Sequence, residues 1–415
     1  SSLAIFLTGQ YGSVDLAGVS IGYNIWIALY TFMMGILLGI TPIVSQLLGG
    51  RKIKHIGNIT KEGLYIATGL ALLLWLLGYF GMKPFLLYLN MEPAAYEICV
   101  FYLKAFSIGL FPILWGCTLR NIIDSHGLTH FSMSIVVFGF VLNVFFNYAL
   151  IFGHFGLPEL GGIGAGYATA ITCWSNFILY SLVLIFHPTF KEYNIFSNWK
   201  LPSWTYIREQ LQIGLPIGFS IFFETSIFSI AGLLMVQFGT AVVAAHQSAL
   251  SFTNIFYCFP LSISMAATIA VAYELGAGKP KEARQYAYIA RIFALIVATL
   301  LCSYSFTHME NIAGLFTSDP VVFDLIMSFL SYAVFFAVID AFGTPLQGIL
   351  RAYKDVRIIS YISLFSYWGV CFPVAYILSR MPEYGPYGVW IGLLSSVSVA
   401  GILFTARAWY IQHKR

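Results

Sequence analysis

The chain has 415 residues, of which 59% are hydrophobic and only 9% are charged, and its mean hydropathy is +0.82. Soluble globular proteins carry about 25% charged residues, so this composition excludes an ordinary soluble domain. The formal net charge of +4 is spread over many connections, which argues against a nucleic-acid partner.

Apolar runs of about 20 residues recur along the whole chain, and each is long enough to cross a bilayer as a helix. They predict an all-α polytopic membrane protein with twelve transmembrane helices, the first of them incomplete. Gly, Pro and Lys/Arg mark the joins between runs, as in LLGGRK and MPEYGPYG. The predicted spans are 1–9, 16–48, 59–82, 94–123, 130–152, 162–187, 204–238, 241–276, 284–307, 321–350, 357–379 and 387–410.

The positive charges predict the orientation of these spans. Seventeen of the 21 Lys and Arg residues, including Lys200, Arg351 and Arg415, fall in connections after even-numbered spans or in the C-terminal tail. Only two follow odd-numbered spans. Because positively charged connections remain in the cytoplasm, both termini are predicted to be cytoplasmic.

An internal repeat with an offset of 227 residues divides the chain. CTLRNIID at 117–124 matches TPLQGILR at 344–351, and LGGRKIK at 48–54 matches LGAGKPK at 275–281. The repeat predicts two six-helix lobes, 1–190 and 204–415, joined by a cytoplasmic linker at 191–203. Because both lobes run in the same direction, the repeat axis is expected along the membrane normal.

The repeat also makes a prediction about the first span. Ala4 corresponds to Ala231, which lies late in span seven. The first span is therefore expected to lack its opening turns, and with them the counterpart of Glu224. Ser1 is accordingly not expected to be the native start.

Two carboxylic acids lie deep in apolar spans. Glu224 lies in LPIGFSIFFETSIFSI and Asp340 lies in SYAVFFAVIDAFGTPL. An acid at that depth costs several kcal/mol unless something compensates it, so each is a functional candidate. Burial and a second acid both disfavour the charged form, so such a pair takes up either a proton or a monovalent cation. The alternative is a pair of neutral acids that brace helices through hydrogen bonds.

Other polar residues in the spans have two interpretations each. Tyr257 offers an oxygen ligand for a cation, or it is a core aromatic residue with a hydrogen-bonded hydroxyl group. Buried amides usually join helices, and the alternative is that they line a polar cavity. Amides of this kind are Asn24, Asn143, Asn147, Asn176 and Gln247, whereas the amide oxygen of Asn254, like the Tyr257 hydroxyl, is a candidate cation ligand. His246, at a helix start, favours a capping or interfacial role.

Signatures of enzymes and of resident metals are missing from the sequence. The six cysteines fall in apolar spans without a CxxC pattern, which favours small buried hydrophobes over zinc ligands or disulfides. The sequence contains no P-loop, no HExxH motif and no nucleophile with a partnered His. The chain is therefore predicted not to be an enzyme and to have no cofactor, and its energy source is predicted to be an ion gradient or a partner.

The run TLRNIIDSHGLTHFSMSIVVFGFVLNVFFNYALIFGHFGLPELGGIGAGYATA resembles the multidrug and toxic compound extrusion (MATE) transporters, in particular their NorM-like branch. PIVSQLLGG, LPIGFSIFFE, VVAAHQSAL and LRAYKD are similar to the same family. The resemblance covers residues 15–380 and implies twelve helices in two lobes around a central cleft. It also implies export of cationic, amphipathic drugs in exchange for sodium or protons.

The resemblance implies roles for particular residues. Glu224 and Asp340 match the family's cation site, and Tyr257 matches a tyrosine beside that cation. Gln247, Asn24 and Asp319 match positions that contact substrate, as do the two acids themselves.

Two positions depart from the family pattern. Ala4 stands where an Asp of the first helix is expected, so coupling is predicted to run through the second lobe and to favour sodium over protons alone. Phe336, in the span predicted at 321–350, stands where some members have a tyrosine, and its side chain supplies no oxygen.

The sequence therefore predicts a monomeric, sodium-coupled (or proton-coupled) multidrug antiporter of the bacterial inner membrane that works by rocking alternating access. Its partners are expected to be cationic drugs and the lipid bilayer. The alternatives are a flippase for lipid-linked saccharides of the same superfamily and a membrane scaffold or receptor without transport activity. A flippase for anionic substrates would favour a basic cleft, whereas the midplane residues here are acidic.

Overall fold

A computed structural model of the chain describes residues 2–88, 92–197, 201–317 and 319–414. Predictions about Ser1, Lys200 and Arg415 lie outside these residues. Every regular element within the described ranges is a helix. This is the physical expectation for a chain in hydrocarbon, because a helix satisfies its own backbone hydrogen bonds.

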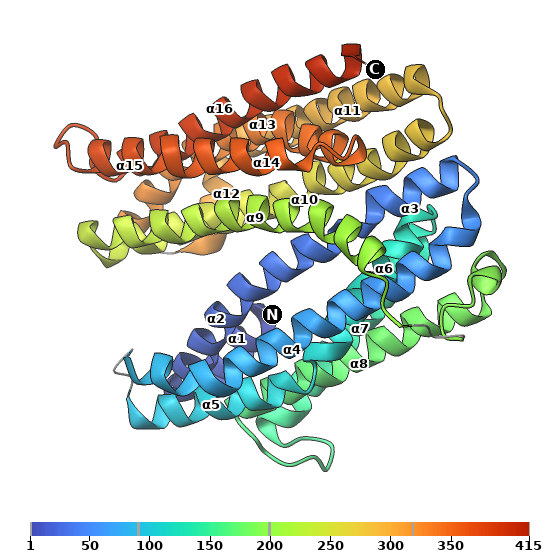
Figure 1. Ribbon diagram of the computed structural model, residues 1–415. Coiled ribbons are helices and arrows are strands. Elements are labelled where there is room, and N and C mark those ends of the chain that lie inside the picture. The colour runs from blue at the N-terminus through green and yellow to red at the C-terminus, as the bar shows by residue number, and fades with distance from the viewer. Residues whose placement is uncertain (1, 89–91, 198–200, 318, 415) are drawn as a thin grey trace. The chain divides into compact units, whose positions relative to one another are not determined.

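The helices form two compact units (Figure 1). Unit 1 comprises residues 1–44 and 52–214, and unit 2 comprises residues 45–51 and 215–415. The elements from the N-terminus to the start of unit 2 are α1 Ser2–Tyr11, α2 Ser13–Leu38, α3 Ile40–Gly49, η1 Ile53–His55, α4 Ile56–Tyr88, α5 Pro93–Ser107, α6 Leu110–Ser125, α7 Thr129–Phe152, α8 Gly162–Phe186 and η2 Pro188–Tyr193.

Unit 2 contains the longest helices of the chain. Helix α10 packs against α11 and α13, and α13 packs in turn against α16. The elements are α9 Trp204–Met235, η3 Val236–Phe238, α10 Thr240–Gly276, α11 Pro280–Thr307, α12 Met309–Phe316, α13 Pro320–Ala352, α14 Val356–Ser363, the π-helix η4 Leu364–Cys371, α15 Phe372–Ser379 and α16 Tyr387–Lys414.

The observed helices follow the predicted spans closely. Ten described stretches are long and apolar enough to cross a membrane, and the bent pair α5–α6 makes an eleventh. The short helix α1 lies where the incomplete first span is expected. Leucines on α4 such as Leu73, Leu76 and Leu77 are about half exposed, which suits a helix that faces hydrocarbon and not water. The chain is thus a multi-pass helical membrane protein.

Three predicted spans are interrupted, and one of them is the span at 94–123, which divides into α5 and α6. The span predicted at 16–48 divides into α2 and α3 at Gly39, and the span predicted at 357–379 contains the π-helix η4. A Cβ atom at Gly39 would lie only 2.7 Å from the backbone of Gly214, so the small residue permits a close approach to α9. Helix α12 was not predicted as a separate element.

The units do not coincide with the predicted lobe boundaries in two places. The first turns of α9, residues 204–214, cluster with unit 1, although the C-terminal lobe was predicted to start at 204. The reason is local packing, because a Cβ atom at Gly214 would lie 2.2 Å from the carbonyl oxygen of Ile36 on α2. Residues 45–51 cluster with unit 2, where Gln46 Nε2 donates to the carbonyl of Ala352 at 2.8 Å.

Candidate functional site

The structure brings the two predicted acids together inside unit 2. Glu224 lies on α9 and Asp340 lies on α13, and their residues are 7% and 6% exposed. Their carboxyl groups are close enough to repel one another electrostatically. Two acids in one buried site are costly when both are ionised, so the arrangement suits a bound cation or proton.

Hydroxyl groups surround the two acids. The Tyr257 hydroxyl on α10 donates a hydrogen bond to the Glu224 carboxylate, and its ring also lies near Asp340. The Thr344 hydroxyl donates to Asp340 Oδ1 at 3.1 Å from one turn further along α13. Carboxylate and hydroxyl oxygens are the ligand types that hard cations prefer.

The π-helix η4 supplies one wall of this site. Tyr367, on η4, is 2% exposed and lies within electrostatic range of Glu224 and Asp340. Helix α9 is joined to η4 by Trp368 Nε1, which donates to Ser226 Oγ at 3.1 Å, and to the end of α14 by a hydrogen bond of 2.9 Å between Ser220 and Ser363. π-Helical segments inside α-helices are rare and recur at functional sites.

The sequence analysis missed two residues of the site, Gln347 and Arg351. Arg351 was counted among the charges of a cytoplasmic connection, and the structure corrects this: α13 extends to Ala352, and Arg351 is only 4% exposed. Gln347, 3% exposed, is a hydrogen-bond partner of Glu224 and also accepts a bond from Arg351 Nη2 at 3.2 Å. The spacing of four residues in LQGILR was the available signal, because it places both side chains on one helix face.

The predicted substrate contacts of unit 2 lie apart from the acids. Asp319 caps the N-terminus of α13, where its carboxylate accepts from the Val321 amide at 2.9 Å. It precedes Asp340 by 21 residues, or roughly 30 Å of helix, so the two acids lie at different depths. Gln247 is exposed on α10, and a Cβ atom at Gly232 would lie 3.5 Å from its Nε2.

His246 does not have the interfacial position that the sequence suggested. Its exposed fraction is 0%, and its ring lies 5.6 Å from that of Trp390 in an edge-to-face arrangement. Neither ring nitrogen has a hydrogen-bond partner within the described part of the chain. The prediction was based on the position of His246 near the start of α10. It was wrong because α16 packs over that turn and buries the side chain.

Unit 1 contains a different polar cluster. Arg120 Nε lies 3.4 Å from Asp124 Oδ2, and the Ser132 hydroxyl donates to the other carboxylate oxygen. Tyr30 and Tyr180 lie within electrostatic range of Arg120. The cluster is therefore neutralised by its own ion pair.

The remaining unit 1 candidates lie outside that ion pair. Ala4, where the family pattern expects an acid, is packed with Val19, Tyr102 and Ala165 in an apolar cluster. Asn24 is exposed on α2. Asn147 donates to Asn143, and Asn143 donates to Thr172 on α8 at 3.2 Å, so these amides join helices.

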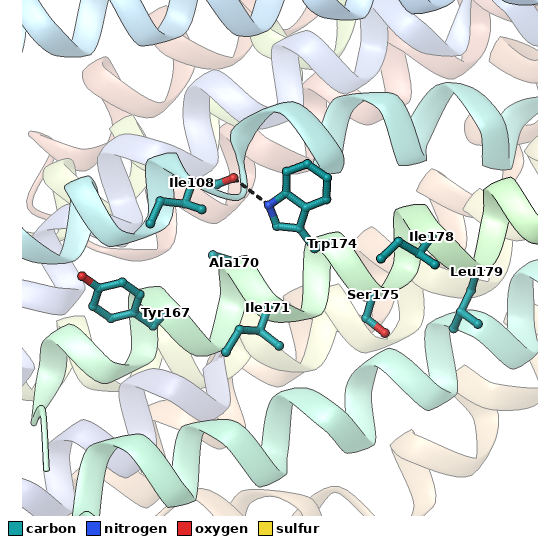
Figure 2. A pocket seen from close by; sticks show the side chains of 8 residues that line it. All are labelled: Ile108, Tyr167, Ala170, Ile171, Trp174, Ser175, Ile178 and Leu179. Carbon is teal, nitrogen blue, oxygen red and sulfur yellow. Dashed lines mark hydrogen bonds between the residues drawn. The ribbon is translucent and has the colours of Figure 1, made fainter. Parts of the chain in front are cut away.

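A hollow of about 440 Å³ lies on unit 1 beside the break between α5 and α6 (Figure 2). Trp174 Nε1 donates to the Ile108 carbonyl at 3.1 Å and thereby satisfies a carbonyl that the break exposes. The lining is mostly apolar, with hydroxyl groups from Tyr167 and Ser175. It is formed by Ile108, Tyr167, Ala170, Ile171, Trp174, Ser175, Ile178 and Leu179.

A clustered site for a transition metal is not found among the described residues, where no three His, Cys, Asp or Glu side chains gather suitably. The oxygen-rich pair of acids in unit 2 remains the strongest candidate for a functional site.

The family model described as MatE matches residues 1–149 and 216–377. The chain belongs to the MatE family. The relatives of this MatE protein include the probable multidrug resistance protein NorM of Oceanobacillus iheyensis, 38% identical over 410 residues that cover 98% of this chain and 91% of the relative. The protein of the same description from Bacillus subtilis is 40% identical over 396 residues, covering 95% and 88%.

A solved structure has the same fold. It is the outward-facing conformation of a multidrug resistance MATE family transporter of the MOP superfamily, with a TM-score of 0.89. It is 19% identical to this MatE protein and covers 99% of it and 92% of the solved chain. The family and the fold both agree with the resemblance stated from the sequence.

Proposed function

We propose that this protein is a sodium-coupled antiporter of the bacterial cytoplasmic membrane that exports cationic, amphipathic drugs. Both termini are cytoplasmic in this proposal, following the bias of positive charge in the connections. The observation that carries it is the buried pair Glu224 and Asp340 in unit 2, with the Tyr257 hydroxyl on Glu224.

Sodium and drug compete for the same negative charge in this mechanism. When the site faces outward, a sodium ion binds between the carboxylates and removes the attraction that holds a cationic drug. When the site faces inward, the ion leaves, and the acids attract the next drug molecule. Exchange of one sodium ion for one monovalent drug cation moves no net charge, so the sodium concentration gradient drives it, and each tenfold sodium gradient supplies about 1.4 kcal/mol.

The two units are proposed to have different roles because their buried charged groups differ. The acids of unit 2 offer the exchangeable site, whereas Arg120 and Asp124 of unit 1 already neutralise each other. Gln247, Asn24 and Asp319 are proposed substrate contacts. They lie outside the group of side chains that touches Glu224, so their substitution should change drug preference more than ion dependence.

Transport in proteoliposomes tests the proposal. A sodium gradient should drive accumulation of a fluorescent organic cation, and Glu224→Gln and Asp340→Asn should each reduce the initial rate at least tenfold. Thr225→Val is the matched control, because the Thr225 hydroxyl bonds back to the carbonyl of Ile221 on its own helix. Undiminished transport by both acid variants would refute the site. Transport that needs a pH gradient and ignores sodium would replace sodium with protons as the coupling ion.

A flippase for lipid-linked saccharides is the second candidate. Such substrates carry phosphate, and an anion would be repelled by the two acids of unit 2. Transfer of an anionic lipid-linked saccharide with no transport of organic cations would favour it over drug export.

A further inference from the structure

Arg351 places a permanent positive charge near Glu224, the acid on α9. Its residue is 4% exposed, and Nε is buried without a hydrogen-bond partner within the described part of the chain. The guanidinium lies within electrostatic range of Glu224 and Tyr257. Because a guanidinium stays protonated at any physiological pH, this charge does not change during transport.

Gln347 connects the guanidinium to the Glu224 carboxylate. Arg351 Nη2 donates to Gln347 Oε1 at 3.2 Å, and the amide of Gln347 hydrogen-bonds to Glu224. The guanidinium thus orients the amide, and the oriented amide presents its N–H to the carboxylate. This relay fixes the Glu224 carboxylate without placing the arginine among the ligands of a cation.

The corresponding positions of unit 1 carry different charges. At the 227-residue offset, Tyr30 corresponds to Tyr257, Arg120 to Gln347 and Asp124 to Arg351. In unit 1 the arginine pairs directly with an aspartate at 3.4 Å. In unit 2 the arginine pairs with a neutral amide, so its charge acts on the Glu224 carboxylate instead.

We propose that Arg351 is a positioning residue that orients Glu224 through Gln347 and offsets one of the two acidic charges, so that a single monovalent cation completes the site. The inference rests on the proposed function, in which Glu224 and Asp340 bind the coupling ion. With both acids ionised, the cluster of Glu224, Asp340 and Arg351 keeps one uncompensated negative charge, and one sodium ion neutralises it.

This fixed charge also keeps sodium binding weak enough for release. An antiporter must let the ion leave on the cytoplasmic side, and a site with two uncompensated acids would hold it too tightly. Removal of the positive charge should therefore strengthen sodium binding and slow turnover. Damage to the fold would have the opposite effect on binding, because it would disperse the ligands.

Sodium-22 binding to purified full-length protein in detergent, at one fixed pH for all variants, tests the proposal. The wild type should bind one sodium ion per chain. Arg351→Gln should lower the half-saturating sodium concentration at least tenfold, which is the effect of removing a charge about 12 Å away at an effective dielectric constant of about 20. Arg351→Lys keeps the charge and should stay within about threefold of the wild type.

Gln347→Glu provides a second test that preserves side-chain shape. The new carboxylate pairs with Arg351, as Asp124 pairs with Arg120 in unit 1. The positive charge of Arg351 then no longer offsets the negative charge of the two acids. Sodium should then bind more tightly, as in Arg351→Gln. Arg407→Gln is the matched control, because Arg407 pairs with Asp355 at 2.5 Å and is not among the charges that act on Glu224.

The outcomes separate this inference from the proposed function. A wild type whose sodium binding is absent, or is unaffected by Glu224→Gln, would overturn the proposed function and this inference with it. Normal wild-type binding that is lost in Glu224→Gln, together with unchanged or weaker binding in both Arg351→Gln and Gln347→Glu, would overturn the inference alone. Two sodium ions bound per wild-type chain would also overturn it.

Discussion

The Thr344 hydroxyl donates to Asp340 Oδ1 at 3.1 Å, across one turn of α13 and with both residues buried. This bond orients the Asp340 carboxylate from within its own helix. Glu224, by contrast, is held by Tyr257 and Gln347 from other helices of unit 2. Different side chains therefore orient the two carboxylates, and substitutions of those side chains test each carboxylate separately.

Thr344→Val should weaken sodium binding about threefold to tenfold, because it leaves a buried carboxylate oxygen without its hydroxyl donor. Half-saturation in sodium-22 binding measures the effect. Thr169→Val is the control, because that hydroxyl in unit 1 donates only to the Ala165 carbonyl of its own helix, at 2.9 Å. Equal effects of the two substitutions would mean that the bond to Asp340 has no special role.

Tyr257→Phe should reduce sodium-driven drug transport about tenfold at low sodium, because it removes both a cation ligand and the donor to Glu224. The loss should shrink at saturating sodium if the hydroxyl acts in ion binding. Tyr273→Phe on the same helix is the control, since Tyr273 is 46% exposed. A loss of the same size at all sodium concentrations would contradict a role in ion binding.

Gly214→Ala should lower the thermal unfolding midpoint by several degrees, because its Cβ atom would meet the Ile36 carbonyl oxygen at 2.2 Å. Backbone atoms have little room to move aside, so α2 and the start of α9 must separate. Gly69→Ala on α4 is the control, since a Cβ atom there meets nothing within 4 Å and alanine favours the helix. A midpoint for Gly214→Ala equal to that of the wild type would show that this close approach is dispensable.

His126 should make stability depend on pH below neutrality. Its Nδ1 lies 2.7 Å from the Ile122 carbonyl and its Nε2 lies 2.8 Å from the Tyr193 hydroxyl, just beyond the end of α6. Burial lowers the pKa of His126 below its usual value of 6.5, with a smaller contribution from the nearby His187. The folded state then binds fewer protons than the unfolded state, so stability is complete above about pH 6.5 and declines as the pH falls through the lowered pKa.

Thermal unfolding at pH 8 and pH 5 measures this effect. The difference between the two midpoints should be smaller in His126→Gln, and should be unchanged in His413→Gln near the exposed C-terminus. Burial also raises the pKa of the neighbouring Tyr193 to about 12, so the tyrosine stays neutral over this range. Identical pH dependence in the wild type and His126→Gln would contradict the assignment.

Local patterns along the chain were sufficient to predict the membrane-spanning helices and the two candidate acids. Hydrocarbon demands about 20 apolar residues in each span, so the period and length of each apolar run reveal the helices directly. The same rule makes a carboxylate within such a run conspicuous, which is how Glu224 and Asp340 were found. The repeat added the correspondence between CTLRNIID and TPLQGILR, because duplicated helices keep their residue spacing.

Only the tertiary structure decided which charges act on the acids. Arg351 follows the end of its apolar run and has the sequence context of a cytoplasmic charge, yet α13 extends past it and neighbouring helices bury it. The family resemblance made Asp319 a candidate substrate contact, and the structure places it at the opposite end of the same helix, where it caps α13. Burial and electrostatics depend on side chains from distant parts of the chain, whereas hydrophobic periodicity depends on neighbours in sequence. The sequence by itself therefore determined the helices and their acids, and packing between helices decided how those acids are supported and neutralised.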